Sequence, residues 1–291
     1  FIVGPRLNAA GRLDDMSVGI ECLLADSTSS ARAKAENLHA LNRERRDIEQ
    51  SMQTEALAQL DALNLDQPDL PFAMTLYDPN WHQGVIGILA SRIRERVYRP
   101  TLIFADSDEG MLKASGRSIP GLHLRDALDQ VAARHPGLLT KFGGHAMAAG
   151  LTLAKADFEP FCEAINTVVA DALDQVPPEP VALSDGSLAP SDLTVPFAEQ
   201  LEAGGPWGQH FAEPVFDNTF AVRRHRIVGE KHLKLTLESG GVEVDAIAFN
   251  IDVDEWLAAP LTQLGALYRL DINDYRGARS PQLVIEAFWP H

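Results

Sequence analysis

Guanidinium and hydroxyl groups are spaced for phosphate binding near the start of this 291-residue chain. The segment Gly4-Pro-Arg-Leu-Asn-Ala-Ala-Gly-Arg12 places two arginines six residues apart among small residues. A guanidinium can donate two parallel hydrogen bonds to one phosphate, and glycine allows another backbone to approach closely. We therefore expect a loop that binds phosphate through Arg6 and Arg12. A purely structural loop, with both arginines paired to Asp14 and Asp15, explains the same residues.

A second segment, Lys113-Ala-Ser-Gly-Arg-Ser118, has the same chemistry at the end of a predicted strand. Gly116 allows the chain to bend, so the two hydroxyls and the guanidinium can converge on one anion. A helix is predicted to follow, and the N–H groups at a helix N-terminus favour negative charge. The alternative is a polar turn in which Arg117 pairs with Asp126 or Asp129.

Two histidines stand where they could approach a ligand. In Phe142-Gly-Gly-His-Ala-Met-Ala-Ala-Gly150, a double glycine lets the backbone pass close to a ligand while His145 points at it. In Trp81-His-Gln-Gly-Val-Ile-Gly87, His82 precedes a predicted helix. The alternatives are structural: a satisfied His145, a Trp81 in the core and a His82 that caps the helix.

Metal ligands and common catalytic signatures are missing from the sequence. The nine histidines are scattered, and no P-loop, dinucleotide fingerprint or nucleophile elbow occurs. A hydrolytic metal centre needs several carboxylate or imidazole ligands, so the sequence predicts no metal site within this chain.

Composition narrows the class of protein. Lys and Arg number 25 against 41 Asp and Glu, and a net charge of −16 argues against a protein that coats nucleic acid through bulk charge. No apolar run is long enough to span a bilayer, and no signal peptide opens the chain. With only two cysteines, we expect a cytoplasmic protein. Because the chain begins with Phe1, we expect it to be processed or to be a piece of a longer protein.

The elements that must position these residues fall into three sections. Residues 1–27 read as a loop and a short apolar stretch. Residues 28–66 contain neither Gly nor Pro and have apolar residues every three or four positions, which predicts one helix of roughly 55 Å. A solitary helix of that length usually connects two domains.

Strands and helices alternate over residues 70–175, which predicts an α/β domain with a small mixed sheet. The predicted strands are 72–76, 101–105, 110–115 and 147–153, and the predicted helices are 85–97, 122–133 and 158–173. A stiff linker, Val176-Pro-Pro-Glu-Pro180, follows.

After the linker the pattern changes to strands, which predicts a small closed barrel of the oligonucleotide-binding (OB) type, with a generic sandwich as the alternative. Basic residues lie on or between its first strands, and three aromatic rings could stack bases or fill the core. The six candidate strands are 216–222, 226–228, 232–238, 242–249, 264–271 and 282–287. The basic residues are Arg223, Arg224, Arg226, Lys231 and Lys234, and the rings are Phe249, Tyr268 and Tyr275.

Five segments in order resemble the C-terminal part of the RecJ family, the bacterial single-stranded-DNA-specific 5′-to-3′ exonucleases of the DHH phosphoesterase superfamily. Four are the segments given above, of which the second phosphate-binding one contributes Ser115-Gly-Arg-Ser118. The fifth is Gly205-Pro-Trp-Gly-Gln-His-Phe-Ala-Glu-Pro-Val-Phe216.

The resemblance implies that the chain has four parts and that the metal-dependent step belongs to a domain of which only the end is present. The four parts are the end of a DHH catalytic domain over 1–27, a connecting helix over 28–68, a DHH-associated domain over 69–175 and an OB barrel over 182–291. The family hydrolyses the terminal phosphodiester with Mn²⁺ or Mg²⁺ held by DHH-domain residues that this sequence lacks. We therefore expect this chain alone to bind no metal and to be inactive.

The resemblance also implies site residues and partners. His145 would line the cleft that faces the metals, as the candidate catalytic residue of this chain. The partners would be single-stranded DNA and, as further candidates, single-strand-binding protein and other recombination proteins. The protein would be a monomer, would act in DNA repair and recombination, and would have no membrane partner. The residues implied to contact DNA or phosphate are Arg6, Asn8, Arg12, His82, Ser115, Arg117, Ser118, Gly143, Gly144 and His145.

Two other functional classes fit the same residues. One is a non-catalytic module that only binds single-stranded nucleic acid. The other is a DHH-family oligoribonuclease or phosphatase that acts on short substrates, against which the predicted barrel argues.

Overall fold

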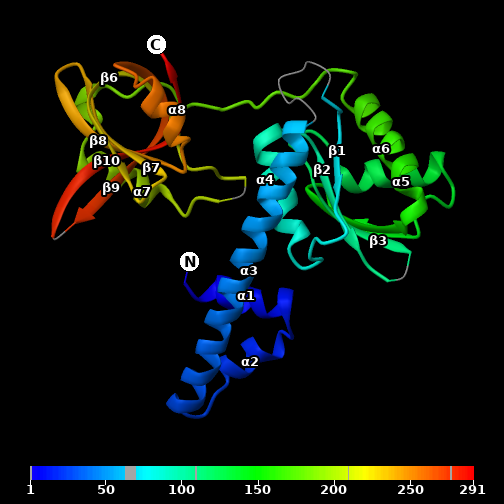
Figure 1. Ribbon diagram of the computed structural model, residues 1–291. Helices are drawn as coiled ribbons and strands as arrows, with labels where there is room; N and C mark the ends of the chain where they lie inside the picture. Colours follow the sequence, from blue (N-terminus) through cyan, green and yellow to red (C-terminus); the bar gives the residue numbers. More distant parts are fainter. Residues whose placement is uncertain (1, 63–69, 109, 209, 276) are drawn as a thin grey trace. The chain divides into compact units, whose positions relative to one another are not determined.

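The computed structural model describes residues 2–62, 70–108, 110–208, 210–275 and 277–291. The chain divides into two compact units, Phe1–Pro180 and Val181–His291 (Figure 1). Within the described ranges, no helix is both long enough and apolar enough to cross a membrane.

The first unit begins with three helices: α1 (Val3–Leu13), α2 (Ser17–Leu23) and α3 (Thr28–Ala62). The first two lie against the third, which is the predicted long helix as far as it is described (Figure 1). The end of that prediction, residues 63–68, lies outside the described residues.

The loop predicted over residues 4–12 is wrong, because this segment is helix α1. Proline is tolerated in the first turn of a helix, where its missing N–H has no intrahelical acceptor, and Pro5 lies there. Ala9 and Ala10 are fully buried, so the small residues allow close helix packing rather than a loop.

A five-stranded sheet follows, in the order β1-β2-β3-β5-β4. Only β1 and β2 are parallel, so the predicted small mixed sheet is confirmed. The sequence patterns missed β4, whose double glycine is untypical of strands. The strands are β1 (Met74–Tyr77), β2 (Thr101–Asp106), β3 (Met111–Arg117), β4 (Lys141–Gly144) and β5 (Ala148–Ala154).

Helices cover the two faces of this sheet unequally. On one face, α5 (Leu124–Arg134) and α6 (Phe158–Ala172) pack on the apolar residues of β2, β3 and β5. On the other face, α3 and α4 (Ile86–Val97) share a core with the apolar residues of β1 and β2, and α4 also lies against β3. Side chains alternate along a strand, so Lys113, Ser115 and Arg117 of β3 lie on this second face. A 3₁₀ turn, Lys155–Asp157, joins β5 to α6.

The second unit is a closed barrel in the order β10-β8-β7-β6-β9, as predicted. It has five strands rather than six, because residues 216–222 and 226–228 belong to one strand with a bulge between Val222 and Arg224. The strands are β6 (Phe216–Val228), β7 (His232–Ser239), β8 (Val242–Phe249), β9 (Gln263–Tyr275) and β10 (Ala278–Pro290). A 3₁₀ turn (Pro190–Asp192) and the short helices α7 (Val195–Gly204) and α8 (Val253–Ala258) complete the unit.

Candidate nucleic-acid interface

A cavity of about 450 Å³ in the first unit collects groups from four separate segments. Arg12 comes from the end of α1, Gly84 and Gly87 from the start of α4, and Gly144 from β4. Ser115 and Arg117 reach it from β3. The two predicted phosphate-binding segments therefore meet, each through part of its residues.

Arg117 has no acidic partner in the described part of the chain. Its Nη1 donates to Ser115 Oγ at 3.2 Å and to the Gly116 carbonyl oxygen at 2.9 Å. Asp126 and Asp129, which the alternative would pair with it, interact with His123 and Arg125 instead. Burial lowers the pKa of Arg117, and the nearby positive charges of Arg12 and Arg94 lower it further. An anion in the cavity would relieve this crowding of positive charge.

Two glycines allow these groups to lie so close to the N-terminal end of α4. A Cβ on Gly87 would lie 3.0 Å from Ser115 Oγ and 3.1 Å from Arg117 Nη2. A Cβ on Gly84 would lie 2.0 Å from the Arg12 carbonyl oxygen. Larger residues would therefore push the guanidinium, or the end of α1, away from the cavity.

The glycine-histidine segment forms the tight turn between β4 and β5. Gly144 lines the cavity, whereas Gly143 and His145 are not among its lining residues. The His145 side chain is exposed, and its backbone N–H donates to the Ala148 carbonyl oxygen at 2.8 Å. The structure therefore does not bring the imidazole to Arg117, and catalytic use of His145 stays a prediction.

Three other predicted contacts lie away from the cavity. Ser118 is fully buried and its Oγ donates to the Leu122 carbonyl oxygen at 2.8 Å, so it stabilises the turn after β3. Arg6 donates to His39 of α3, since six residues of helix turn its side chain about 240° from that of Arg12. Asn8 is exposed on α1 and does not line the cavity.

A second, polar cavity of about 580 Å³ shares Arg12, Gln83, Gly84 and Lys113 with the first. His82 lines it, and its Nδ1 accepts the Gly84 N–H at 3.0 Å, a bond within the turn before α4. This is not the helix cap given as the alternative, because the N-cap of α4 is Val85 and has no side-chain cap bond. Trp81 also reaches this cavity, but its ring is buried in the core and its Nε1–H donates to Glu55 at 2.9 Å.

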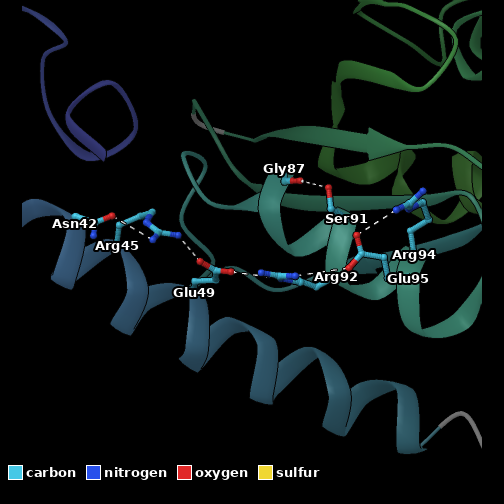
Figure 2. A network of polar contacts seen from close by, with 8 residues as sticks. All are labelled: Asn42, Arg45, Glu49, Gly87, Ser91, Arg92, Arg94 and Glu95. Carbon is cyan, nitrogen blue, oxygen red and sulfur yellow. Dashed lines mark hydrogen bonds and ion pairs between the residues drawn. The ribbon is translucent and has the colours of Figure 1, made fainter. Parts of the chain in front are cut away.

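A polar network that the sequence patterns did not reveal connects α3 to α4 (Figure 2). Arg45 is buried and interacts with Asn42 and Glu49 on α3, and Glu49 also contacts Arg92 of α4 at 3.7 Å. Glu95 continues the network from Arg92 to Arg94, whose charge acts on Arg117. The only available sequence signal was the alternation of arginine and glutamate on both helices.

In the second unit, the basic residues divide into paired and unpaired ones. Arg223 pairs with Glu238, and Lys234 pairs with Asp245. In the described part of the barrel, the exposed side chains of Arg224, Arg226 and Lys231 have no acidic partner. These three define the unpaired basic patch.

The three barrel aromatics that were expected to stack bases or fill the core have different surroundings. Tyr268 is fully buried, where burial raises its pKa, and it donates to Asn218 at 2.7 Å, so it belongs to the core. Phe249 and Tyr275 are exposed. The Phe249 ring lies against His232 of β7, with 5.1 Å between ring centroids.

The described residues contain no group of three or more His, Cys, Asp and Glu side chains that could hold a metal ion.

Two family models match this chain, one in each of its two units. The DHHA1 domain matches residues 70–171, and the RecJ OB domain matches residues 184–287.

Similarity to curated proteins extends over the whole chain. The chain is 51% identical to the single-stranded-DNA-specific exonuclease RecJ of Dickeya dadantii and 49% identical to that of Escherichia coli. Each alignment covers all of this chain and 51% of the relative, so the chain spans about half the length of these proteins and corresponds to their C-terminal half.

A solved structure agrees with the fold of the whole chain. The crystal structure of RecJ in complex with Mn²⁺ from Thermus thermophilus matches with a TM-score of 0.77 at 29% identity, covering 100% of this chain and 41% of that one. The Mg²⁺ complex of the same protein matches with a TM-score of 0.76.

Proposed function

Since the chain corresponds to the C-terminal half of RecJ, we propose that it is the strand-binding portion of a single-stranded-DNA-specific 5′-to-3′ exonuclease. One observation carries the proposal at the site. Arg117 and Arg12 line one cavity at the start of a helix, and neither has an acidic partner in the described part of the chain.

At this site, Arg117 and Ser115 would bind the phosphate at the 5′ end, and Arg12 would bind from the opposite side. A guanidinium can donate two hydrogen bonds to one phosphate, and the N-terminus of α4 adds the partial positive charge of the helix dipole. Gly144 would keep the cavity open toward the reacting bond, with Gly143 and His145 beside it. The unpaired basic patch would bind the strand further from its end.

The four-part division expected from the sequence belongs to this proposal. In it, residues 1–27 are the C-terminal end of a catalytic domain. In that domain Mn²⁺ or Mg²⁺ would activate the attacking water and stabilise charge on the phosphate. No residue described in this chain is assigned to the metal. Single-strand-binding protein as a partner, a monomeric state and a cytoplasmic location, which the two free cysteines fit, are further parts of the proposal.

The test compares the affinity of the chain for 5′-phosphorylated and 5′-hydroxyl oligonucleotides. We expect tighter binding of the phosphorylated strand, and we expect Arg117→Ala to remove the preference with a loss of about ten- to hundredfold. Equal affinities of the unmodified chain for both ends would contradict the proposal. The same chain with manganese should release no mononucleotides, and chelator-sensitive release would show that the active site is complete within it.

A further inference from the structure

The Arg117 cavity, which Lys113, Ala148 and Gly150 also line, occupies part of a wider uncovered face of the sheet in the first unit. Helix α4 lies against β3 on this face of the sheet. Beyond β3, the same face continues over β5 and then β4. Opposed residues of neighbouring strands share a face, so the registers define three rows across it. These rows are Arg117–Ala148, Ser115–Gly150–Gly143 and Lys113–Thr152–Lys141.

The middle row forms a floor almost without side chains. Gly143 and Gly150 are exposed, and a Cβ on Gly143 would have no atom within 4 Å. A Cβ on Gly150 would approach only the Ala114 carbonyl oxygen, at 3.4 Å. A ligand can therefore lie directly on the backbone of these strands.

The outer rows carry positive charge on both sides of this floor. Lys113 and Lys141 are exposed, and neither has an ion pair or hydrogen bond partner among the residues that the structure describes. Their Cα atoms are about 10 Å apart across Thr152, since neighbouring strands lie ~4.8 Å apart, so both long side chains can reach one group above that threonine. Lys113 is four residues from Arg117, or about 13 Å along the strand.

The charge and the shape together specify the occupant. No aromatic ring belongs to the three rows, so the face offers no base-stacking surface, while its cations suit phosphate. We propose that this face, which we call the backbone track, binds the sugar-phosphate backbone of a single strand. On the track, Lys113 and Lys141 together hold an internal phosphodiester while Arg117 holds the terminal phosphate. This inference rests on the proposed function and adds a second phosphate subsite to it.

The test uses the whole chain and three probes: thymidine 5′-monophosphate, a 5′-phosphorylated thymidine trinucleotide, and the same trinucleotide with neutral methylphosphonate linkages. Calorimetry at several salt concentrations gives affinities and salt slopes. Lys113→Ala and Lys141→Ala should each lower trinucleotide affinity up to about fivefold, as for one exposed ion pair. Each should also reduce the slope of log K against log salt by about 0.7. Lys141→Ala should leave affinity for the monophosphate and the neutral trinucleotide unchanged, because Lys141 does not line the Arg117 cavity. Lys113→Ala should weaken the monophosphate less than the trinucleotide, because Lys113 lies at the edge shared by the cavity and the outer row.

Arg125→Ala provides the matched control, because this arginine lies on α5, which covers the opposite face of the sheet, and it also removes one exposed positive charge. A lysine variant that behaves like Arg125→Ala, or that weakens the monophosphate as much as the trinucleotide, would overturn the backbone track. Unchanged salt slopes would do the same.

The two proposals fail in different ways. If the unmodified chain does not bind the monophosphate, the terminal-phosphate site is wrong. The track is then judged on a 5′-hydroxyl trinucleotide, whose two internal linkages are its ligand. Failure to bind that probe, or binding that both lysine variants leave intact, would overturn the track.

Discussion

Arg117 is a partly buried cation whose charged neighbours are themselves positive. A structural arginine with this burial normally has a carboxylate partner, and the described residues provide only a hydroxyl and a backbone carbonyl. The simplest physical reason for this arrangement is a bound anion. Arg117 should therefore contribute more to ligand binding than to folding.

Arg117→Ala should leave the melting temperature of the free chain unchanged or slightly higher, because it removes repulsion between like charges. Inorganic phosphate should raise the melting temperature of the unmodified chain, since a ligand that binds only the folded state stabilises it, and should not do so for the variant. Thermal unfolding with and without phosphate measures both effects. A lower melting temperature for the phosphate-free variant would indicate a structural role instead.

Gly144 and Gly143 differ sharply although they are neighbours. Gly144 has φ of +147°, and a Cβ there would lie 2.4 Å from the Ala148 carbonyl oxygen, whereas a Cβ on Gly143 meets open space. Gly144→Ala should lower the free energy of unfolding by about 1–3 kcal/mol, and Gly143→Ala by less than ~0.5 kcal/mol. Chemical denaturation measures both losses. A loss for Gly144→Ala as small as that for Gly143→Ala would show that the hairpin turn tolerates the added methyl group.

Residue types only partly predicted which side chains reach the cavity. Arg12, Ser115, Arg117 and Gly144 do converge. Arg6 does not, because the helical phase of α1 turns it toward α3. The buried Ser118 hydroxyl is used by the Leu122 carbonyl, a local bond that no sequence spacing reveals.

Among the elements, the contact between α3 and α4 sets where the cavity lies. Glu49 is the acidic centre of the network in Figure 2, with 14% of its side chain exposed. It faces Arg45 on its own helix and Arg92 on α4. The network therefore links α3 to α4, the helix whose first turn borders the cavity.

Glu49→Gln should lower the free energy of unfolding by about 2–4 kcal/mol, because it leaves the buried Arg45 without a charge partner. Arg92→Ala should cost less than ~1 kcal/mol, since its side chain is 54% exposed. The combined variant Arg45→Met with Glu49→Gln should regain part of the loss, because an apolar side chain replaces the buried charge. Denaturation of the three variants tests this order, and a cost for Arg92→Ala as large as for Glu49→Gln would contradict it.

Periodicity predicted these elements where one face was apolar and failed where small residues dominated. The alternation in β3 and the apolar spacing in α3 were enough to identify them. The glycines and the proline of α1 disfavour a helix, and the double glycine of β4 disfavours a strand. Packing against α3 and pairing with β5 therefore decide their structure. The bulge in β6 shifts the alternation of side chains by one residue, so the sequence pattern predicted two strands where the structure has one.

At the scale of the whole molecule, a proline-rich segment links two units, and the proposed function gives each unit a binding surface of its own. Each unit has its own core, one around the sheet and one inside the barrel. Two weak sites on one chain bind a long strand much more tightly than either site does alone, provided the strand reaches both. Short and long strands should therefore respond differently to changes in the barrel.

The triple variant Arg224→Ala, Arg226→Ala, Lys231→Ala removes the unpaired basic patch without touching the barrel core, because all three side chains are exposed. Its affinity for a 20-nucleotide strand should fall by about tenfold or more, and its salt slope by about 2, which corresponds to three lost phosphate contacts at ~0.7 each. Affinity for a trinucleotide should not change, since the proposal assigns the strand end to the first unit. Arg279→Ala is the control, because that exposed barrel arginine pairs with Glu199 on α7. Fluorescence anisotropy with both strand lengths over a range of salt measures these effects. Equal losses on short and long strands would mean that the barrel binds the strand end itself, and no loss on either would remove the patch from the nucleic-acid interface.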